Sequence, residues 1–213
     1  MKKPIFYIFT FIYLGILFFL ITALQSCKNE KTKVVYTKKH EIINYGNTGI
    51  KDKKAAELFN EGLKNVENRD FYTAEEFFQK ADAIEKDNTV ILNSIALMSE
   101  KFSNYEEAEL TYNRIFSNDT LSIITYINYG RFLVAQQKFE QGNQILLKGY
   151  QIAQHLNNSI DPLLLFNLSI SYFYMKDCEN AIKFIKLAKA NAADEIFRKQ
   201  IEEFLFEMTT ICR

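Results

Sequence analysis

Residues 123–142 read IITYINYGRFLVAQQKFEQG, and two glycines twelve positions apart, Gly130 and Gly142, mark this stretch. The same spacing of small residues occurs twice upstream, in the pairs Gly62/Ala74 and Ala96/Ala108. The first members of the three pairs follow one another at intervals of 34 residues. Because a fixed period of about 20 to 50 residues is typical of repeat architectures, we expect stacked copies of one supersecondary unit.

The small residues also set the boundaries of the units. If the first small residue is position 8, units begin at Ala55, Thr89 and Ile123, and the pair Ser169/Ala181 adds a unit at Pro162. Small residues at positions 8 and 20 let two antiparallel helices approach closely, and large residues at positions 4, 17 and 24 fill the space between units. Position 24 is large in all four units, as Phe78, Tyr112, Leu146 and Ile185.

With this period and these positions, the chain resembles the tetratricopeptide-repeat (TPR) family over residues 55–195. The resemblance implies an all-α fold, a right-handed α-solenoid of about four helix–turn–helix units closed by a C-terminal capping helix over residues 196–213. The expected units are 55–88, 89–122, 123–156 and 162–195.

The fourth unit departs from the pattern because it starts 39 residues after the third. We expect the five extra residues, near 151–161, to lengthen the preceding helix by more than one turn. Asp161 should then cap the next helix, with Pro162 in its first turn.

Composition limits the classes of function. Hydrophobic residues are 48% and charged residues 24% of the 213 residues, which excludes a disordered chain, and 7 Gly with 2 Pro disfavour a many-stranded β-sandwich. Residues 28–54 hold eight Lys against three acidic residues, whereas residues 55–213 are net negative. No basic face is large enough to make nucleic acid the expected partner.

The first 27 residues predict the location. Lys2 and Lys3 precede an uncharged apolar run, which ends in Leu24-Gln25-Ser26-Cys27. This ending resembles the lipobox of bacterial lipoproteins, which implies a signal peptide over 1–26, lipidation of Cys27 and a flexible basic tether over 27–54. An uncleaved signal anchor is the alternative, although the lysines after the run disfavour it. We expect a lipid-anchored protein of the bacterial cell envelope, at the outer membrane, with its periplasmic or surface face left open.

Catalytic motifs are missing from the sequence. The two histidines, His40 and His155, are too far apart to bind a metal at helical spacing, and the chain has no Gly-rich phosphate loop and no Gly-x-Ser-x-Gly. Acidic clusters, Glu75-Glu76 and Glu106-Glu107-x-Glu109, stand at the expected starts of second helices, where they complement the helix dipole. We therefore expect no enzyme, no metal, no cofactor and no small-molecule substrate, and a cell-wall enzyme is disfavoured.

Two cysteines remain after Cys27. Cys178 begins the second helix of the fourth unit, and a capping helix running back antiparallel to it returns Cys212 towards Cys178. In an oxidising compartment we expect a disulfide between them. The alternative is a free Cys178 in an aromatic position, with Cys212 at a frayed terminus.

The family resemblance also implies a concave groove, lined by positions 2, 5, 6, 9, 12 and 13 of the first helices. Asparagine can donate to and accept from a peptide backbone, and aromatic residues can hold apolar side chains. Two alternatives stay open, since the asparagines fit a solvated helix surface and the two phenylalanines fit packing against a neighbouring helix. The candidate groove residues are Asn60, Asn93, Asn128, Arg131, Phe166, Asn167, Phe173 and Tyr174.

These features predict a non-enzymatic adaptor that is tethered to the envelope and binds a protein or peptide in its groove. An obligate accessory subunit of an outer-membrane assembly or secretion complex is the alternative. The two differ in whether the chain is stable without a companion.

Overall fold

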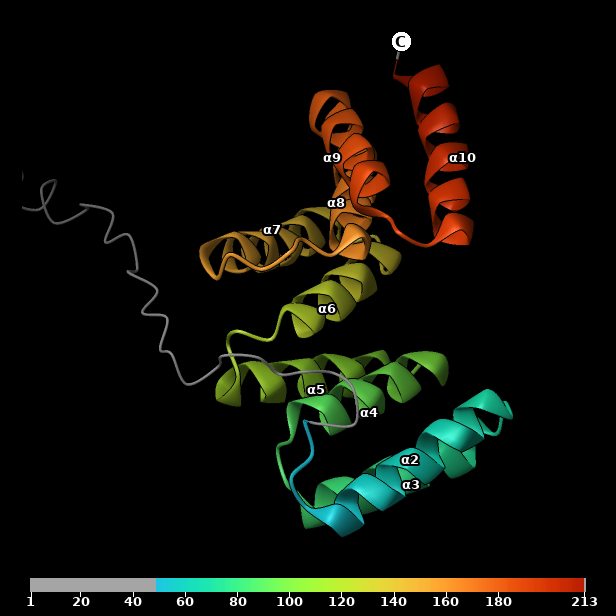
Figure 1. Cartoon of the computed structure of the whole chain (residues 1–213), viewed down its shortest axis with the longest axis vertical. Coiled ribbons are helices and arrows are strands. Elements are labelled where there is room, and N and C mark those ends of the chain that lie inside the picture. Colours follow the sequence, from blue (N-terminus) through green and yellow to red (C-terminus); the bar gives the residue numbers. More distant parts are fainter. Residues whose placement is uncertain (1–48, 213) are drawn as a thin grey trace, which may run out of the picture. The chain divides into compact units, whose positions relative to one another are not determined.

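The computed structural model describes residues 49–212, and Figure 1 shows this part of the chain as a succession of helices. The predicted signal peptide (1–26), Cys27, His40 and nearly all of the tether lie outside the described residues. The regular elements between residues 49 and 212 are all helical, which confirms the predicted all-α solenoid. They are α2 (Lys53–Glu67), α3 (Phe71–Ile84), α4 (Thr89–Lys101), α5 (Tyr105–Asn118), α6 (Ile123–Ala135), α7 (Phe139–His155), α8 (Pro162–Tyr174), α9 (Cys178–Asn191) and α10 (Glu195–Ile211).

The helices pair as successive hairpins, α2 with α3, α4 with α5, α6 with α7 and α8 with α9, and α10 packs against α9 (Figure 1). The first helices of neighbouring hairpins also contact each other, α4 with α6 and α6 with α8. The helices α4, α6 and α8 begin at Thr89, Ile123 and Pro162, the residues at which the sequence places unit starts. α2 begins earlier than Ala55, because the Asp52 carboxylate accepts a hydrogen bond from the Ala55 N–H at 2.9 Å and caps the helix.

Close helix approach explains the small residues at positions 8 and 20. A Cβ added to Gly142 would lie 2.9 Å from the carbonyl oxygen of Gly130 and 2.7 Å from Cγ2 of Val134, closer than side chains pack. A Cβ on Gly130 would overlap the side chain of Leu146. In the fourth unit Ser169 takes the small position, and its hydroxyl donates to the carbonyl of Ala181 at 2.8 Å. The serine is therefore accommodated because its buried polar atom has a partner.

The turn inside each hairpin has the same backbone conformation. Arg69, Ser103, Gln137 and Lys176, all at position 15, have φ of 61–63°. In the first hairpin the N–H of Asp70, the residue that follows, donates to the carbonyl of Asn65, and the other three turns repeat this bond. This is a Schellman-type helix end, which usually uses glycine for the left-handed residue. The four units thus share one turn conformation, although no glycine marks it in the sequence.

The extra residues before the fourth unit are divided between a helix and a connection. α7 has 17 residues, against 14 in α3, α5 and α9, so three of the five lengthen the helix by less than one turn. The prediction of more than one extra turn is therefore wrong. Asn157, with φ of 52°, ends the helix, and the other two residues lengthen the connection to α8. The predicted cap is confirmed, since Asp161 accepts a hydrogen bond from Leu163 N–H at 2.8 Å and Pro162 opens α8.

The apolar core follows the array of hairpins in two clusters. One is built mainly from α3, α4 and α5, and the other from α8, α9 and α10 with parts of α6 and α7. The four large residues at position 24 are at most 1% exposed. A solenoid of this kind leaves the last repeat without a neighbour, and α10 supplies one by burying Ile201 and Met208.

Candidate functional site

The site begins with a pocket of about 660 Å³ that lies between α6, the start of α7 and α8. Three of the predicted groove residues, Arg131, Asn167 and Tyr174, line it together. The remaining lining residues are mostly apolar: Val134, Ala135, Gln137, Phe139 and Ile170. The pocket therefore lies on the first helices of the third and fourth hairpins, where the groove was expected.

Two aromatic rings form one wall of this pocket. Phe139 and Tyr174 stack with ring centroids 4.8 Å apart and an interplanar angle of 10°. Tyr174 is 53% exposed, so much of its ring faces solvent. Exposed aromatic surface beside a pocket is a common anchor point for apolar side chains of a partner.

The charge of Arg131 is balanced within the protein. Its Nη2 donates to Oε2 of Glu100 at 2.6 Å, and the Tyr112 hydroxyl donates to Oε1 of the same carboxylate at 2.6 Å. Burial raises the pKa of Tyr112 well above its ordinary value, and the charge of Glu100 raises it further. Because Glu100 already neutralises Arg131, the pocket has little net charge, and a ligand carboxylate would have to compete with Glu100 for the guanidinium.

Two of the predicted asparagines belong to a buried network between the second and third hairpins. The Asn93 side chain, 5% exposed, donates to the carbonyl of Thr89 at 2.9 Å and to Oγ1 of Thr125 at 2.8 Å. It also accepts from Nδ2 of Asn128 at 3.0 Å. The amide of Asn93 therefore joins α4 to α6 and is not offered to a ligand, and one donor of Asn128 is used in the same way. Neither matches the solvated surface that was the alternative.

The two predicted phenylalanines pack against the capping helix. Phe166 lies edge-on to Phe197 and Phe204, with centroids 5.5 and 5.7 Å apart, and Phe173 lies edge-on to Phe204 at 5.7 Å. This arrangement matches the alternative of packing against a neighbouring helix. Both side chains are half-buried, so α10 covers part of the ring surface that was expected to contact a ligand.

The other two asparagines differ from each other. Asn60 is exposed on α2, away from the pocket. Asn167 lines the pocket but is only 5% exposed, and its Nδ2 donates to the carbonyl of Leu163 at 2.9 Å. The structure thus brings Arg131, Asn167 and Tyr174 together and places the other five candidates elsewhere.

Sequence reasoning missed most of the apolar lining. Val134, Ala135 and Ile170 occupy positions 12, 13 and 9 of their units, which are groove positions, but the sequence-based prediction names only polar and aromatic residues. Phe139 was missed for another reason, since it begins a second helix. The signal for the first three was present in the repeat numbering itself.

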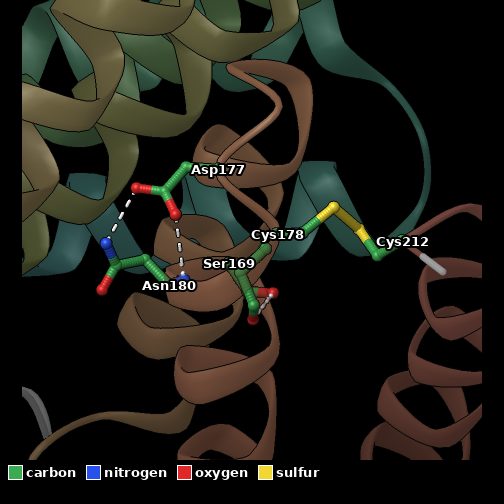
Figure 2. The surroundings of a disulfide bond; sticks show 6 residues. Ser169, Asp177, Cys178, Asn180 and Cys212 are labelled. Atoms are coloured by element: carbon green, nitrogen blue, oxygen red, sulfur yellow. Dashed lines mark hydrogen bonds between the residues drawn. A yellow bond between two sulfur atoms is a disulfide. The ribbon is translucent and has the colours of Figure 1, made fainter.

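The disulfide lies at the end of the array, and neither of its cysteines lines the pocket. Figure 2 shows Cys178, at the start of α9, bonded to Cys212, which follows α10. Their Cα atoms are 5.6 Å apart, within the usual range for a disulfide. The bond joins the predicted pair of cysteines and ties the capping helix to the last repeat.

The acidic residues predicted at helix starts differ in their positions. Glu106 and Glu107 lie in the first turn of α5, as the helix-dipole interpretation requires. Glu109 lies beyond that turn and the first turn of α3 has no acidic residue, so the interpretation is wrong for Glu75, Glu76 and Glu109. Within residues 49–212, no group of His, Cys, Asp and Glu side chains could hold a metal ion. None of the helices in this same part has the length and hydropathy needed to cross a membrane.

The comparisons with known proteins support the fold. No protein-family model and no curated protein matches the sequence. The structure is similar to that of PilF from Pseudomonas aeruginosa, with a TM-score of 0.62 and 15% identity over 76% of this chain and 78% of that chain. It is also similar to MamA (residues 41 to end) from Desulfovibrio magneticus RS-1, with a TM-score of 0.57 and 15% identity over 76% and 94% of the two chains. The structure is also similar to that of a MamA RS-1 double mutant, with a TM-score of 0.60 and 15% identity over 75% of this chain and 85% of that chain. These neighbours are TPR-type proteins, and at this identity the likeness concerns the fold alone.

Proposed function

We propose that this chain is a membrane-tethered adaptor that binds a segment of another protein in the pocket between α6 and α8. The TPR-type neighbours support a protein-interaction role. The observation that carries the proposal is the pocket itself, which combines an apolar floor, a half-exposed aromatic wall at Tyr174 and a guanidinium already neutralised by Glu100.

This chemistry favours an apolar segment without a carboxylate. An apolar side chain entering the pocket would bury surface of Val134, Ala135 and Ile170, which favours binding at about 25 cal/mol per Å² of apolar area removed from water. A carboxylate would gain little from Arg131 because its charge is compensated. The adaptor therefore differs from a receptor for charged peptide tails.

The test fills the pocket without disturbing the core. Ala135 is an exposed residue of α6 that lines the pocket, so Ala135→Arg should block a ligand and leave the fold intact. Ala83, exposed on α3 and outside the pocket, provides the matched control, Ala83→Arg. A photoreactive amino acid at position 135 or 83 in intact cells then reports contacts.

We expect position 135 to form a discrete crosslinked product that position 83 does not form. Affinity purification of the full chain should recover that same partner with Ala83→Arg and lose it with Ala135→Arg. Equal recovery with the two variants would refute the assignment of the binding site to this pocket.

We further propose that Cys27 carries the lipid that tethers the adaptor to the envelope, as the resemblance of residues 24–27 to a lipobox implies. Growth with an alkyne-tagged fatty acid should label the chain, and Cys27→Ser should abolish the labelling. Cys212→Ser should keep the label. Labelling that survives Cys27→Ser would refute the tether.

The obligate-subunit alternative has support of its own on α10. Ile196, Phe206 and Ile211 are 73%, 75% and 68% exposed, and a companion protein could cover them. A chain that stays soluble and monodisperse when produced alone favours the adaptor. Aggregation of the chain alone, cured by co-expression with one companion, favours the subunit.

A further inference from the structure

A second pocket, of about 460 Å³, lies between α5 and the turn that joins α6 to α7, and no residue lines both pockets. Its apolar surface comes from Tyr105, Leu110 and Phe132. Tyr105 is 43% and Leu110 58% exposed, so two large apolar side chains face solvent at its mouth. Exposed apolar side chains grouped at a hollow are a feature of docking surfaces.

Two carboxylates, Glu106 and Glu109, lie in the lining of this pocket. Glu109 is neutralised, since Lys138 donates to its Oε2 at 3.0 Å and the Tyr129 hydroxyl donates to its Oε1 at 3.2 Å. Glu106, which lines the pocket, and Glu107, which follows it in α5 outside the lining, are exposed. Neither has a hydrogen bond or ion pair from side chains of residues 49–212.

The excess negative charge extends towards the first hairpin. The pKa of Glu75, on α3, is raised by partial burial and by the charge of Glu107. A like charge nearby disfavours the ionised form of a carboxyl group and shifts its pKa in this direction. A cationic group placed there would relieve the repulsion.

We propose that this second pocket docks a protein segment in which an aliphatic or aromatic side chain is flanked by lysine or arginine residues. The apolar side chain would cover Leu110 and Tyr105, and the flanking cations would lie beside Glu106 and Glu107. Charge complementarity of this kind selects partners and speeds their association. The same carboxylates disfavour an acidic segment and an anionic membrane surface, because like charges repel. The adaptor would then hold two partners at separate surfaces.

The test measures the binding of short fluorescent peptides to the full chain by anisotropy. The probe is Lys-Lys-Leu-Tyr-Lys-Lys. The comparison peptides replace either its lysines by glutamates or its two apolar residues by serines. We expect the probe to bind, the glutamate peptide not to bind and the serine peptide to bind at least tenfold more weakly.

Two variants test the location of binding. Glu106→Gln combined with Glu107→Gln should weaken binding about fivefold, as expected for two exposed ion pairs, and should reduce its dependence on salt. Leu110→Ser should also weaken binding about fivefold through lost apolar contact. Matched controls are Glu203→Gln combined with Glu207→Gln on α10, and Leu187→Ser on α9, all at exposed positions. These controls should leave the affinity unchanged.

Several outcomes would overturn the proposal: no binding of the probe up to millimolar concentration, equal binding of the lysine and glutamate peptides, or variants at 106, 107 and 110 that bind like their controls. Loss of binding in Ala135→Arg alone would assign the probe to the pocket between α6 and α8 instead. Since the two pockets share no residue, a negative result at the second pocket would not contradict the proposed binding in the pocket between α6 and α8.

Discussion

Removal of the Cys178–Cys212 disulfide should destabilise the capping helix selectively. The bond closes a loop with a sequence separation of 34 residues, which spans α9 and α10. By the chain-entropy estimate, a loop of this length corresponds to about 3.8 kcal/mol at 25 °C. Without the bond, α10 depends on its aromatic contacts, its buried Ile201 and Met208, and a surface ion pair between Lys189 and Glu202.

The loss should be local because repeats interact with their nearest neighbours. A local change of about 3.8 kcal/mol corresponds to about a 500-fold change in the equilibrium between closed and open α10. Amide hydrogen exchange measures this opening helix by helix. In Cys178→Ala combined with Cys212→Ala, we expect exchange in α10 to accelerate by up to about 500-fold, and exchange in α2–α5 to stay unchanged.

Reduction provides the matched control. Wild-type protein treated with a thiol reductant should show the same pattern as the double variant, and reductant should change nothing further in the variant. Two free thiols in protein purified without reductant, or an acceleration spread evenly over all helices, would refute the reasoning. Unchanged exchange in α10 would refute it as well.

Three further predictions concern the body of the array. Gly142→Ala should lower the free energy of unfolding by about 1–3 kcal/mol, because the new Cβ would meet the backbone oxygen of Gly130 at 2.9 Å, and an unchanged urea midpoint would contradict this. Burial and a neighbouring glutamate raise the pKa of Tyr129 from 10.0 to about 12. Tyr129 therefore loses its proton at a lower pH in the unfolded chain than in the folded protein, and the free energy of unfolding should fall between pH 10 and 12. The fall should be less steep in Tyr129→Phe. Arg114→Met should cost about 1–3 kcal/mol in thermal unfolding, because Asp82, with 16% of its side chain exposed, loses two hydrogen bonds at 2.9 and 3.1 Å, and a melting temperature equal to wild type would contradict it.

The repeat fold could be predicted from the sequence because its cause is local. Each hairpin forms from residues close in the chain. Its two helices can cross closely only where the residue that each contributes to the crossing is small, as at Gly130 and Gly142. That requirement recurs with the period and is therefore readable in the sequence. The cap at Asp161 was predictable for the same reason, since it concerns residues two positions apart.

The turn conformation was not readable from residue types. The left-handed residues at position 15 are Arg69, Ser103, Gln137 and Lys176, none of them the glycine that usually marks such a turn. The helix-end hydrogen bonds and the packing of the paired helices hold these residues in place against a preference of roughly 1–2 kcal/mol. The residue types at these turns therefore do not reveal that all four have the same backbone conformation.

Only the tertiary structure decided which of the candidate groove side chains are used between helices and which line a pocket. Asn93 and Asn167 are both asparagines of first helices, yet the first binds the next hairpin and the second lines a pocket. Phe166 packs against α10 because that helix, close to it in space, covers the last repeat. The sequence by itself determined the repeating hairpins, since they depend on contacts within about 34 residues. Which side chains remain available to a partner depends on how neighbouring hairpins and the cap come together, and only the tertiary structure contains that information.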